Sequence, residues 1–165
     1  MPPFLLDANF FIEAYRKGFP MDVVPSFWDK LKELSIVSKV ISLDKVKAEI
    51  FKHEDALKQW CENHLPENFF YDSSEVILVY GEVVRWAHSK RDNPYTQAAL
   101  DVFMDADTAD AWLVAYALQH GLPLVTNEVS APDSKRSIKI PDVCRPFGVQ
   151  VYQPMDMFRA LGERI

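Results

Sequence analysis

Apolar residues along the chain form short continuous runs that alternate with longer stretches of helical periodicity. Phe4–Leu6 is the first such run, and it ends at Asp7. A short uninterrupted apolar run is typical of a buried parallel strand, which is covered on both faces. Leu122–Thr126 repeats the pattern and is followed by Glu128. The other segments that we expect to form strands are residues 40–41, 69–71 and 149–152.

Between these runs, the spacing of apolar residues predicts helices. The most regular stretch contains Val46, Ile50, His53, Leu57 and Trp60, spaced at four, three, four and three. We therefore expect one helix there, capped by Ser42 or Asp44. Further helices are expected at residues 9–17, 24–34, 76–87, 95–104, 107–119 and 155–161. Residues 130–147 carry three prolines and are expected to form an irregular loop.

Strands that alternate with helices indicate an α/β fold in which helices cover both faces of a parallel sheet. The length of 165 residues, without a repeat or a Gly/Ser linker, predicts a single domain over residues 1–165. In open parallel sheets, ligands bind beyond the carboxyl ends of the strands. That edge of the sheet is therefore where we look for chemistry.

Composition narrows the class of protein. Hydrophobic residues make up 48% of the chain, and the net charge of −6 argues against nucleic-acid binding through bulk positive charge. The N-terminal residues lack the charged region of a signal peptide, and no apolar stretch approaches the ~20 residues of a membrane span. The two cysteines, Cys61 and Cys144, are expected to be reduced thiols of a cytoplasmic protein without a membrane partner.

Four acidic residues interrupt the apolar pattern at telling positions. Asp7 and Glu128 follow strands, Asp110 lies in the first turn of the 107–119 helix, and Glu49 borders a buried helical stripe. Carboxylates that converge in a cleft repel one another, and a hard divalent cation relieves that repulsion. Mg²⁺ or Mn²⁺ would fit such oxygen ligands and would activate a water beside a phosphate. The pattern therefore indicates metal-assisted hydrolysis of a phosphodiester.

Each acid also has an ordinary structural explanation. Asp7 can open the helix that follows it, and Glu128 can be a turn residue. Glu49 can be a solvated helix residue, and Asp110 can favour a helix start through the helix dipole. The expected fold brings strand ends and helix starts to one edge of the sheet. A structural explanation for each acid separately therefore does not readily explain why all four are expected at that edge.

The chain resembles the PIN-domain nucleases in four segments, which occur in the family's order and spacing. The segment 4–12 resembles the opening motif, a hydrophobic strand followed by Asp7, a spacer, Asn9 and apolar residues. Residues 42–50 resemble the second motif, in which Glu49 precedes an aliphatic residue. Residues 110–117 and 121–128 resemble the third and fourth motifs, and residues 139–144 resemble a subgroup of uncharacterised, toxin-like bacterial PIN proteins.

The resemblance implies a three-layer α/β/α sandwich with a central parallel sheet and an Mg²⁺- or Mn²⁺-dependent ribonuclease. It further implies the toxin of a type II toxin–antitoxin pair, VapC-like, acting as a homodimer and held by a protein antitoxin. Carried onto this chain, it makes Asp7, Glu49, Asp110 and Glu128 the catalytic residues. The metal ligands would be Asp7, Asp110 and Glu128.

Two further positions are implied as supporting residues: Asn9 would orient Asp7, and Thr126 would support it. Glu128 departs from the family, which commonly has Asp at this position, so the ligand here is one methylene longer. Asp105 and Asp107 are close enough in sequence to replace a ligand at the helix start.

Other functions stay open at this point. A catalytically idle PIN-like binding module has the same motifs, and a nuclease or phosphodiesterase acting on DNA or on a small phosphorylated substrate would use the same acids. Two groups of cations could hold phosphates: Lys135, Arg136, Lys139 and Arg145, and separately His88, Lys90 and Arg91. Phe10, Phe11 and Trp28 could stack on bases but are more typical of a core.

Overall fold

A computed structural model describes all residues, 1–165, and shows a five-stranded, all-parallel sheet. The strand order across the sheet is β3-β2-β1-β4-β5. The strands are β1 (Phe4–Leu6), β2 (Val40–Leu43), β3 (Phe70–Tyr71), β4 (Leu124–Val125) and β5 (Val151–Tyr152). Each of the five lies within or overlaps a segment whose apolar run predicted a strand. The α/β class with a central parallel sheet is thereby confirmed.

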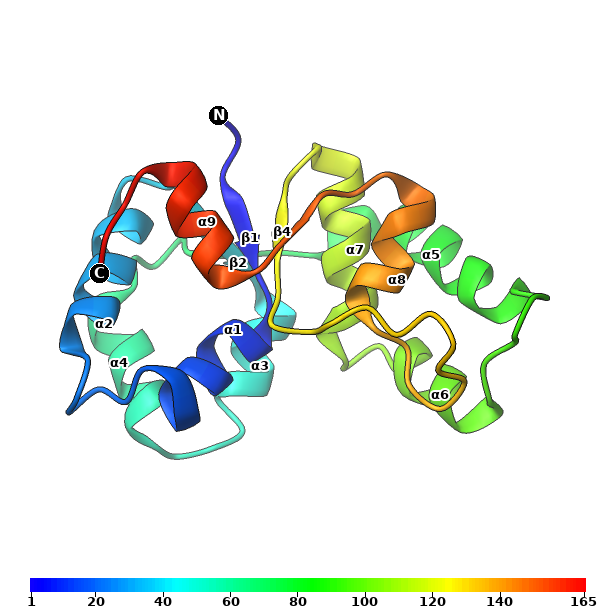
Figure 1. The fold of residues 1–165 in the computed structure, drawn as a ribbon, viewed down its shortest axis with the longest axis horizontal. Coiled ribbons are helices and arrows are strands. Elements are labelled where there is room, and N and C mark those ends of the chain that lie inside the picture. Colours follow the sequence, from blue (N-terminus) through cyan, green and yellow to red (C-terminus); the bar gives the residue numbers. More distant parts are fainter.

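Helices cover both faces of the sheet, so that the molecule has three layers (Figure 1). On one side lie α1 (Ala8–Glu13), α2 (Pro25–Ile36), α4 (Ala56–His64) and α9 (Pro154–Leu161). On the other side lie α5 (Ile77–Ser89), α6 (Gln97–Met104), α7 (Ala109–His120) and α8 (Ile140–Phe147). Helix α3 (Asp44–Ile50) contacts both α1 and α7. A π-helical turn, η1 (Ala14–Gly18), extends α1, and a 3₁₀ turn, η2 (Ser74–Val76), precedes α5. None of these helices has the length and apolar content needed to cross a bilayer.

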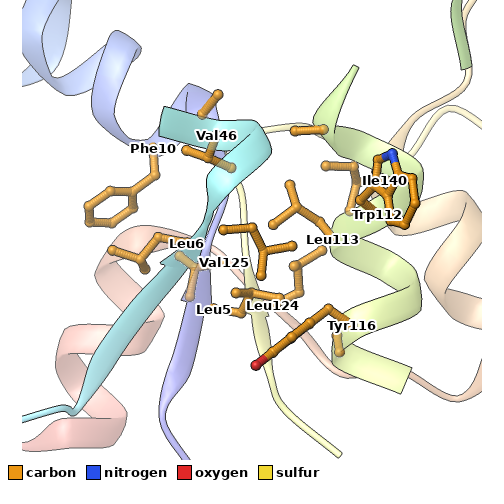
Figure 2. Packing of buried hydrophobic residues seen from close by; sticks show 14 of the residues in the cluster. Leu5, Leu6, Phe10, Val46, Trp112, Leu113, Tyr116, Leu124, Val125 and Ile140 are labelled. Atoms are coloured by element: carbon orange, nitrogen blue, oxygen red, sulfur yellow. The ribbon is translucent and has the colours of Figure 1, made fainter. Parts of the chain in front are cut away.

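The central strands are buried on both faces, as their unbroken apolar runs predict. Leu5 and Leu6 are fully buried and point to opposite faces because side chains alternate along a strand. Leu113 of α7 packs near Leu124 of β4 in the core, whereas Trp112 lies beside Ile140 on another side of α7 (Figure 2). Helix α7 is apolar nearly all round because it is enclosed between the sheet and helices α5 and α8. It ends at Gly121, which adopts a φ of 66° that favours glycine.

The single helix expected around residues 46–60 is wrong, because two helices replace it. Helix α3 ends at Ile50, and α4 begins only at Ala56. Asp55 caps α4 by accepting the N–H of Lys58 at 3.0 Å, and His53 lies exposed in the break. The cap competes with helix continuation, since an Asp side chain in extended backbone satisfies a first-turn N–H. A sequence can therefore keep an apolar periodicity across a break.

The irregular loop expected over residues 130–147 is also wrong in its second half. Residues Ile140–Phe147 form α8. Pro141 lies in the first turn, where a missing N–H costs nothing, and Pro146 lies in the last turn. Residues 127–139, which join β4 to α8, are called the strap below.

Candidate active site

Asp7 lies at the carboxyl edge of the sheet, directly after β1. Its side chain is buried, with 2% of the residue exposed. The Oδ1 atom accepts the N–H of Phe10 at 2.8 Å and so caps α1. The backbone N–H of Asp7 donates to the carbonyl of Val125 at 3.2 Å. The carboxylate is therefore held between a central strand and the start of a helix, as the carboxyl-edge rule predicts.

Thr126 reaches Asp7 from the neighbouring strand. The pairing of Leu6 with Val125 brings the residues that follow β1 and β4 side by side. Thr126 is fully buried and makes a side-chain hydrogen bond with Asp7. Its Oγ1 also accepts the N–H of Glu128 at 3.0 Å. One hydroxyl thus connects the backbone of one site acid to the carboxylate of another.

Glu128 lies near the start of the strap, and its side chain reaches α8. Its Oε2 accepts the N–H of Ile140, the first residue of α8, at 2.7 Å. Its backbone carbonyl accepts a hydrogen bond from the side chain of Gln153 at 3.3 Å. The carboxylate therefore has one oxygen on a helix start and leaves the other without a hydrogen bond to the chain.

Glu49 and Asp110 meet at the start of α7. Glu49 is half-buried on α3, and its Oε1 accepts the N–H of Ala109 at 2.9 Å. This bond caps α7, whose own N-cap residue Thr108 makes no side-chain cap. Asp110, the next residue, lies in the first turn of α7. The contact therefore fixes α3 against the turn that carries Asp110.

The electrostatics show that the four acids share one region. Burial, opposed by the hydrogen bonds from Thr126 and Phe10, raises the pKa of Asp7 from 3.8 to about 7, with further increases from the charges of Glu128 and Glu49. Burial first, and then the charges of Glu128, Asp7 and Glu49, raise the pKa of Asp110 well above its ordinary value. Lys139 acts in the opposite direction on Asp110. Asp7 is thus buried and Asp110 partly buried, and both acids have little compensating charge.

The donor chemistry fits a hard divalent cation, because every group is a carboxylate oxygen. The carboxylates are farther apart than in a formed metal site, since no group of three or more His, Cys, Asp or Glu side chains is close enough to hold a metal ion. Three of the carboxylates instead use an oxygen to accept a backbone N–H. Mg²⁺ is often bound by only one or two protein carboxylates and keeps several waters, so the lack of a three-residue cluster does not conflict with the donor chemistry.

Other predicted positions lie apart from this group. Asn9 was expected to orient Asp7, but no hydrogen bond joins its side chain to Asp7. Its backbone carbonyl accepts a hydrogen bond from the side chain of Asn127 at 3.2 Å. Asp105 and Asp107 are exposed between α6 and α7, where Asp105 accepts the N–H of Asp107 at 2.9 Å. The charges of these two acids are not among the causes that shift the pKa of Asp110.

A pocket of about 340 Å³ opens beside the acids. Asp110 and Glu128 line one part of it, and Arg136 and Lys139 from the strap line another. The face of α6 forms an apolar wall, to which Ala98, Ala99, Val102 and Phe103 contribute. Of the four cations noted before the last strand, the structure thus brings two to the acids and leaves Lys135 and Arg145 outside the pocket.

The second group of cations and the aromatic side chains have other surroundings. Lys90 lies over the ring of Tyr95, and His88 and Arg91 are exposed, with none of these cations lining the pocket. The aromatic residues considered for base stacking are buried in the core; they are Phe10, Phe11 and Trp28.

The cysteines do not provide a nucleophile. Burial raises the pKa of both Cys61 and Cys144 to about 12, and both are free thiols. They are protonated at neutral pH and pack as small apolar residues.

Two residues that were not predicted as part of the site help to shape it: Ser42, which was expected as a helix cap but lies in β2, and Asp142. Ser42 is fully buried in β2, and its Oγ donates to the carbonyl of Leu6 at 2.6 Å, just before Asp7. Asp142 in α8 accepts from the side chain of Ser130 and from the N–H of Ala131 at 2.8 Å, and so holds the strap. A polar residue inside the apolar run of β2 was the signal for Ser42. Nothing local pointed to Asp142.

Comparison with known proteins places the chain in a family. The family described as "Domain of unknown function (DUF4411)" matches residues 4–165. The chain belongs to the DUF4411 family. No curated protein matches the sequence of this DUF4411 chain.

Among solved structures, the chain is similar to one in the crystal structure of VapBC2 from Rickettsia felis bound to a DNA fragment from their promoter. The TM-score is 0.56 at 16% identity, over 91% of this chain and 97% of that one. At this identity the likeness concerns the fold, and the PIN-like architecture of the DUF4411 chain rests on it.

Proposed function

We propose that this protein is a divalent-metal-dependent nuclease that hydrolyses phosphodiester bonds of RNA. The observation that carries the proposal is the pair of acids with raised pKa values at the carboxyl edge of a PIN-like sheet, the buried Asp7 and the partly buried Asp110. Buried carboxylates without a cation are costly, and proteins retain them mainly where they bind metals or do chemistry. The fold, the acids and the open cationic pocket together support this class of reaction.

In this proposal Asp7 and Asp110 hold Mg²⁺ or Mn²⁺ directly, and Glu128 acts directly or through water. The bound metal would neutralise charge on a phosphate and acidify a water. Glu49 and Glu128 each have an oxygen without a hydrogen bond to the chain, which can orient or accept a proton from the attacking water. Thr126 keeps the Asp7 carboxylate in place.

The test is cleavage of a mixed RNA pool by the wild-type protein with Mn²⁺, with EDTA, and by Asp7→Asn with Mn²⁺. We expect products with 5′-phosphate ends from the wild-type protein with Mn²⁺ alone. Equal cleavage by Asp7→Asn, or cleavage that survives EDTA, would overturn the proposal. A parallel single-stranded DNA pool tests the alternative substrate.

Two observations favour a second candidate, a catalytically idle binding module. The carboxylates do not form a three-ligand cluster, and Glu128 is longer than the Asp that is common at this position in the PIN-domain nucleases that the chain resembles. An idle module would show no Mn²⁺-dependent cleavage of RNA or DNA and no stabilisation by millimolar Mn²⁺.

We further propose that the protein is the toxin of a type II toxin–antitoxin pair, acting in the cytoplasm as a homodimer bound by a protein antitoxin. The fold likeness to a chain of VapBC2 supports this role. Induced expression of the wild-type protein should arrest bacterial growth, whereas Asp7→Asn should not. Light scattering of the purified protein should give twice the mass of 19.0 kDa. Normal growth with soluble wild-type protein would contradict the toxin role.

A further inference from the structure

Two cations of the strap line the pocket without forming an ion pair, although Lys139 is close enough to lower the pKa of Asp110. Neither Arg136 nor Lys139 enters any ion pair of the structure, and neither side chain makes a hydrogen bond. Both line the pocket that also contains Asp110 and Glu128. Lys139 is half-buried at the start of α8, so its charge is partly shielded from water. Unpaired cations in a concave site are suited to an anionic ligand.

The strap is fixed at several points, which makes these cations part of a built site. Its start is tied to α8 by the Glu128 carboxylate, and its middle by Asp142. The carbonyl of Lys135 accepts the N–H of Thr96, the N-cap of α6, at 2.9 Å. In Figure 1 the yellow and orange strap runs beside α6. The backbone that carries the two cations is therefore held in place before a ligand arrives, which lowers the cost of binding.

The opposite wall of the pocket is apolar and partly exposed. Val102 of α6 is 65% exposed at this wall, while Ala99 and Phe103 below it are buried. The pocket therefore combines carboxylates, cations and an aliphatic surface. Its volume of about 340 Å³ is at the small end of ligand sites, which start at ~300 Å³. A single nucleotide of a chain has this size and this combination of phosphate and apolar ring.

We propose that this pocket is the subsite for one nucleotide of single-stranded RNA, with Arg136 and Lys139 on its phosphates and the aliphatic face of α6 against its ribose and base. The inference rests on the proposed nuclease function and adds the residues that position its substrate. Lys135 and Arg145 are exposed and lie outside the pocket, so they provide matched charge controls. Leu78 of α5, 81% exposed, provides an apolar control.

The experiment measures binding apart from cleavage. Fluorescence anisotropy of a labelled mixed-sequence oligoribonucleotide is recorded in EDTA over a range of KCl concentrations. For single strands, the slope of log K against log salt is about −0.7 for each phosphate contacted. Arg136→Ala and Lys139→Ala should each reduce the steepness of this slope by about 0.7. Lys135→Ala and Arg145→Ala should leave it unchanged.

The apolar wall has a different signature. Val102→Ser should raise Kd several-fold with no change in the salt slope, because it removes no charge, while Leu78→Ser should leave both unchanged. A wild-type slope in both Arg136→Ala and Lys139→Ala, or equal changes in the control variants, would overturn the subsite. Absence of RNA binding by the wild-type protein would also overturn it.

Cleavage by the same proteins separates this inference from the nuclease proposal. If the wild-type protein cleaves RNA with Mn²⁺ and the variants keep the wild-type salt slope, the subsite proposal is wrong and the nuclease proposal stands. If the Arg136 and Lys139 variants have altered salt slopes but the wild-type protein does not cleave RNA, the nuclease proposal is wrong and the pocket is an RNA-binding site. If the pocket instead receives a protein segment, the variants lose that partner and keep the wild-type RNA slope, which also overturns the subsite.

Discussion

Asp7 is the residue at which folding and the proposed function conflict most clearly. It caps α1 and is enclosed by β1 and β4, yet burial holds its pKa near 7. A neutral residue of the same shape would serve the cap equally well. The acid therefore has a cost to the metal-free fold that an Asn would avoid.

The first prediction concerns the pH dependence of stability without metal. The unfolded chain releases the Asp7 proton near pH 3.8 and the folded chain near pH 7. Between these values the folded state binds more protons, so rising pH removes stability, up to about 4 kcal/mol at ~1.4 kcal/mol per pKa unit. Chemical unfolding in EDTA should show that Asp7→Asn gains stability over wild type between pH 4 and pH 8. A constant difference across this range would contradict the raised pKa.

A second prediction at this scale concerns Thr126. Thr126→Val keeps the shape but removes the hydroxyl that bonds Asp7 and accepts the N–H of Glu128. The pKa of Asp7 should rise further, and the unpaired N–H should cost about 1–3 kcal/mol. Denaturant unfolding measures the loss of stability, and NMR titration of the Asp7 carboxyl carbon measures the pKa. Thr126→Ser, which keeps the hydroxyl, should retain most of both properties.

At the scale of elements, α7 depends on a residue from another helix for its start. Glu49 of α3 supplies the cap that Thr108 does not. The same carboxylate belongs to the candidate site. Stability and activity can therefore be separated by the choice of substitution at this one position.

The third prediction uses that separation. Glu49→Ala should lose about 1 kcal/mol of folding stability, because the N–H of Ala109 loses its acceptor. Glu49→Gln keeps an oxygen acceptor and should retain most of this stability, yet RNA cleavage should fall at least ~10-fold. Thermal unfolding and initial cleavage rates give the two readouts. Full activity of Glu49→Gln would show that Glu49 only caps α7 and takes no part in cleavage.

At the scale of the whole molecule, the sheet joins two halves that each supply part of the site. Asp7 comes from the first strand, whereas Asp110 comes from the helix layer on the other side of the sheet. A cation between them would hold the N-terminal strand and α7 together. Metal binding should therefore stabilise the entire fold.

The fourth prediction follows from this linkage. Mn²⁺ at about 100 times its Kd should stabilise the wild-type protein by about 2.7 kcal/mol, with the largest effect near pH 8, where the acids are ionised. Asp7→Asn and Asp110→Asn should show little of this stabilisation. Thermal unfolding at stepwise Mn²⁺ concentrations measures the shift. An equal shift in both variants would place the metal elsewhere.

The sequence by itself determined the class of fold and the location of its five strands. Unbroken apolar runs such as Phe4–Leu6 predict buried strands because a strand covered on both faces has no polar side. The positions of Asp7 and Glu128 after such runs were sufficient to predict that they approach one edge of the sheet. A local pattern is sufficient for this prediction, because the burial of consecutive residues determines where a strand lies and where it ends.

Only the tertiary structure decided which side chains meet and which oxygen atoms are already engaged. The bonds of Glu49 to Ala109 and of Glu128 to Ile140 join residues far apart or across a loop. The contact of Asp142 with Ala131 also crosses a loop, so no local pattern predicts it. Helix α8 was missed for a different reason: its prolines indicated a loop, although they lie in its first and last turns. The break between α3 and α4 was hidden for a related reason: apolar spacing reports which face is buried, whereas capping decides where a helix ends.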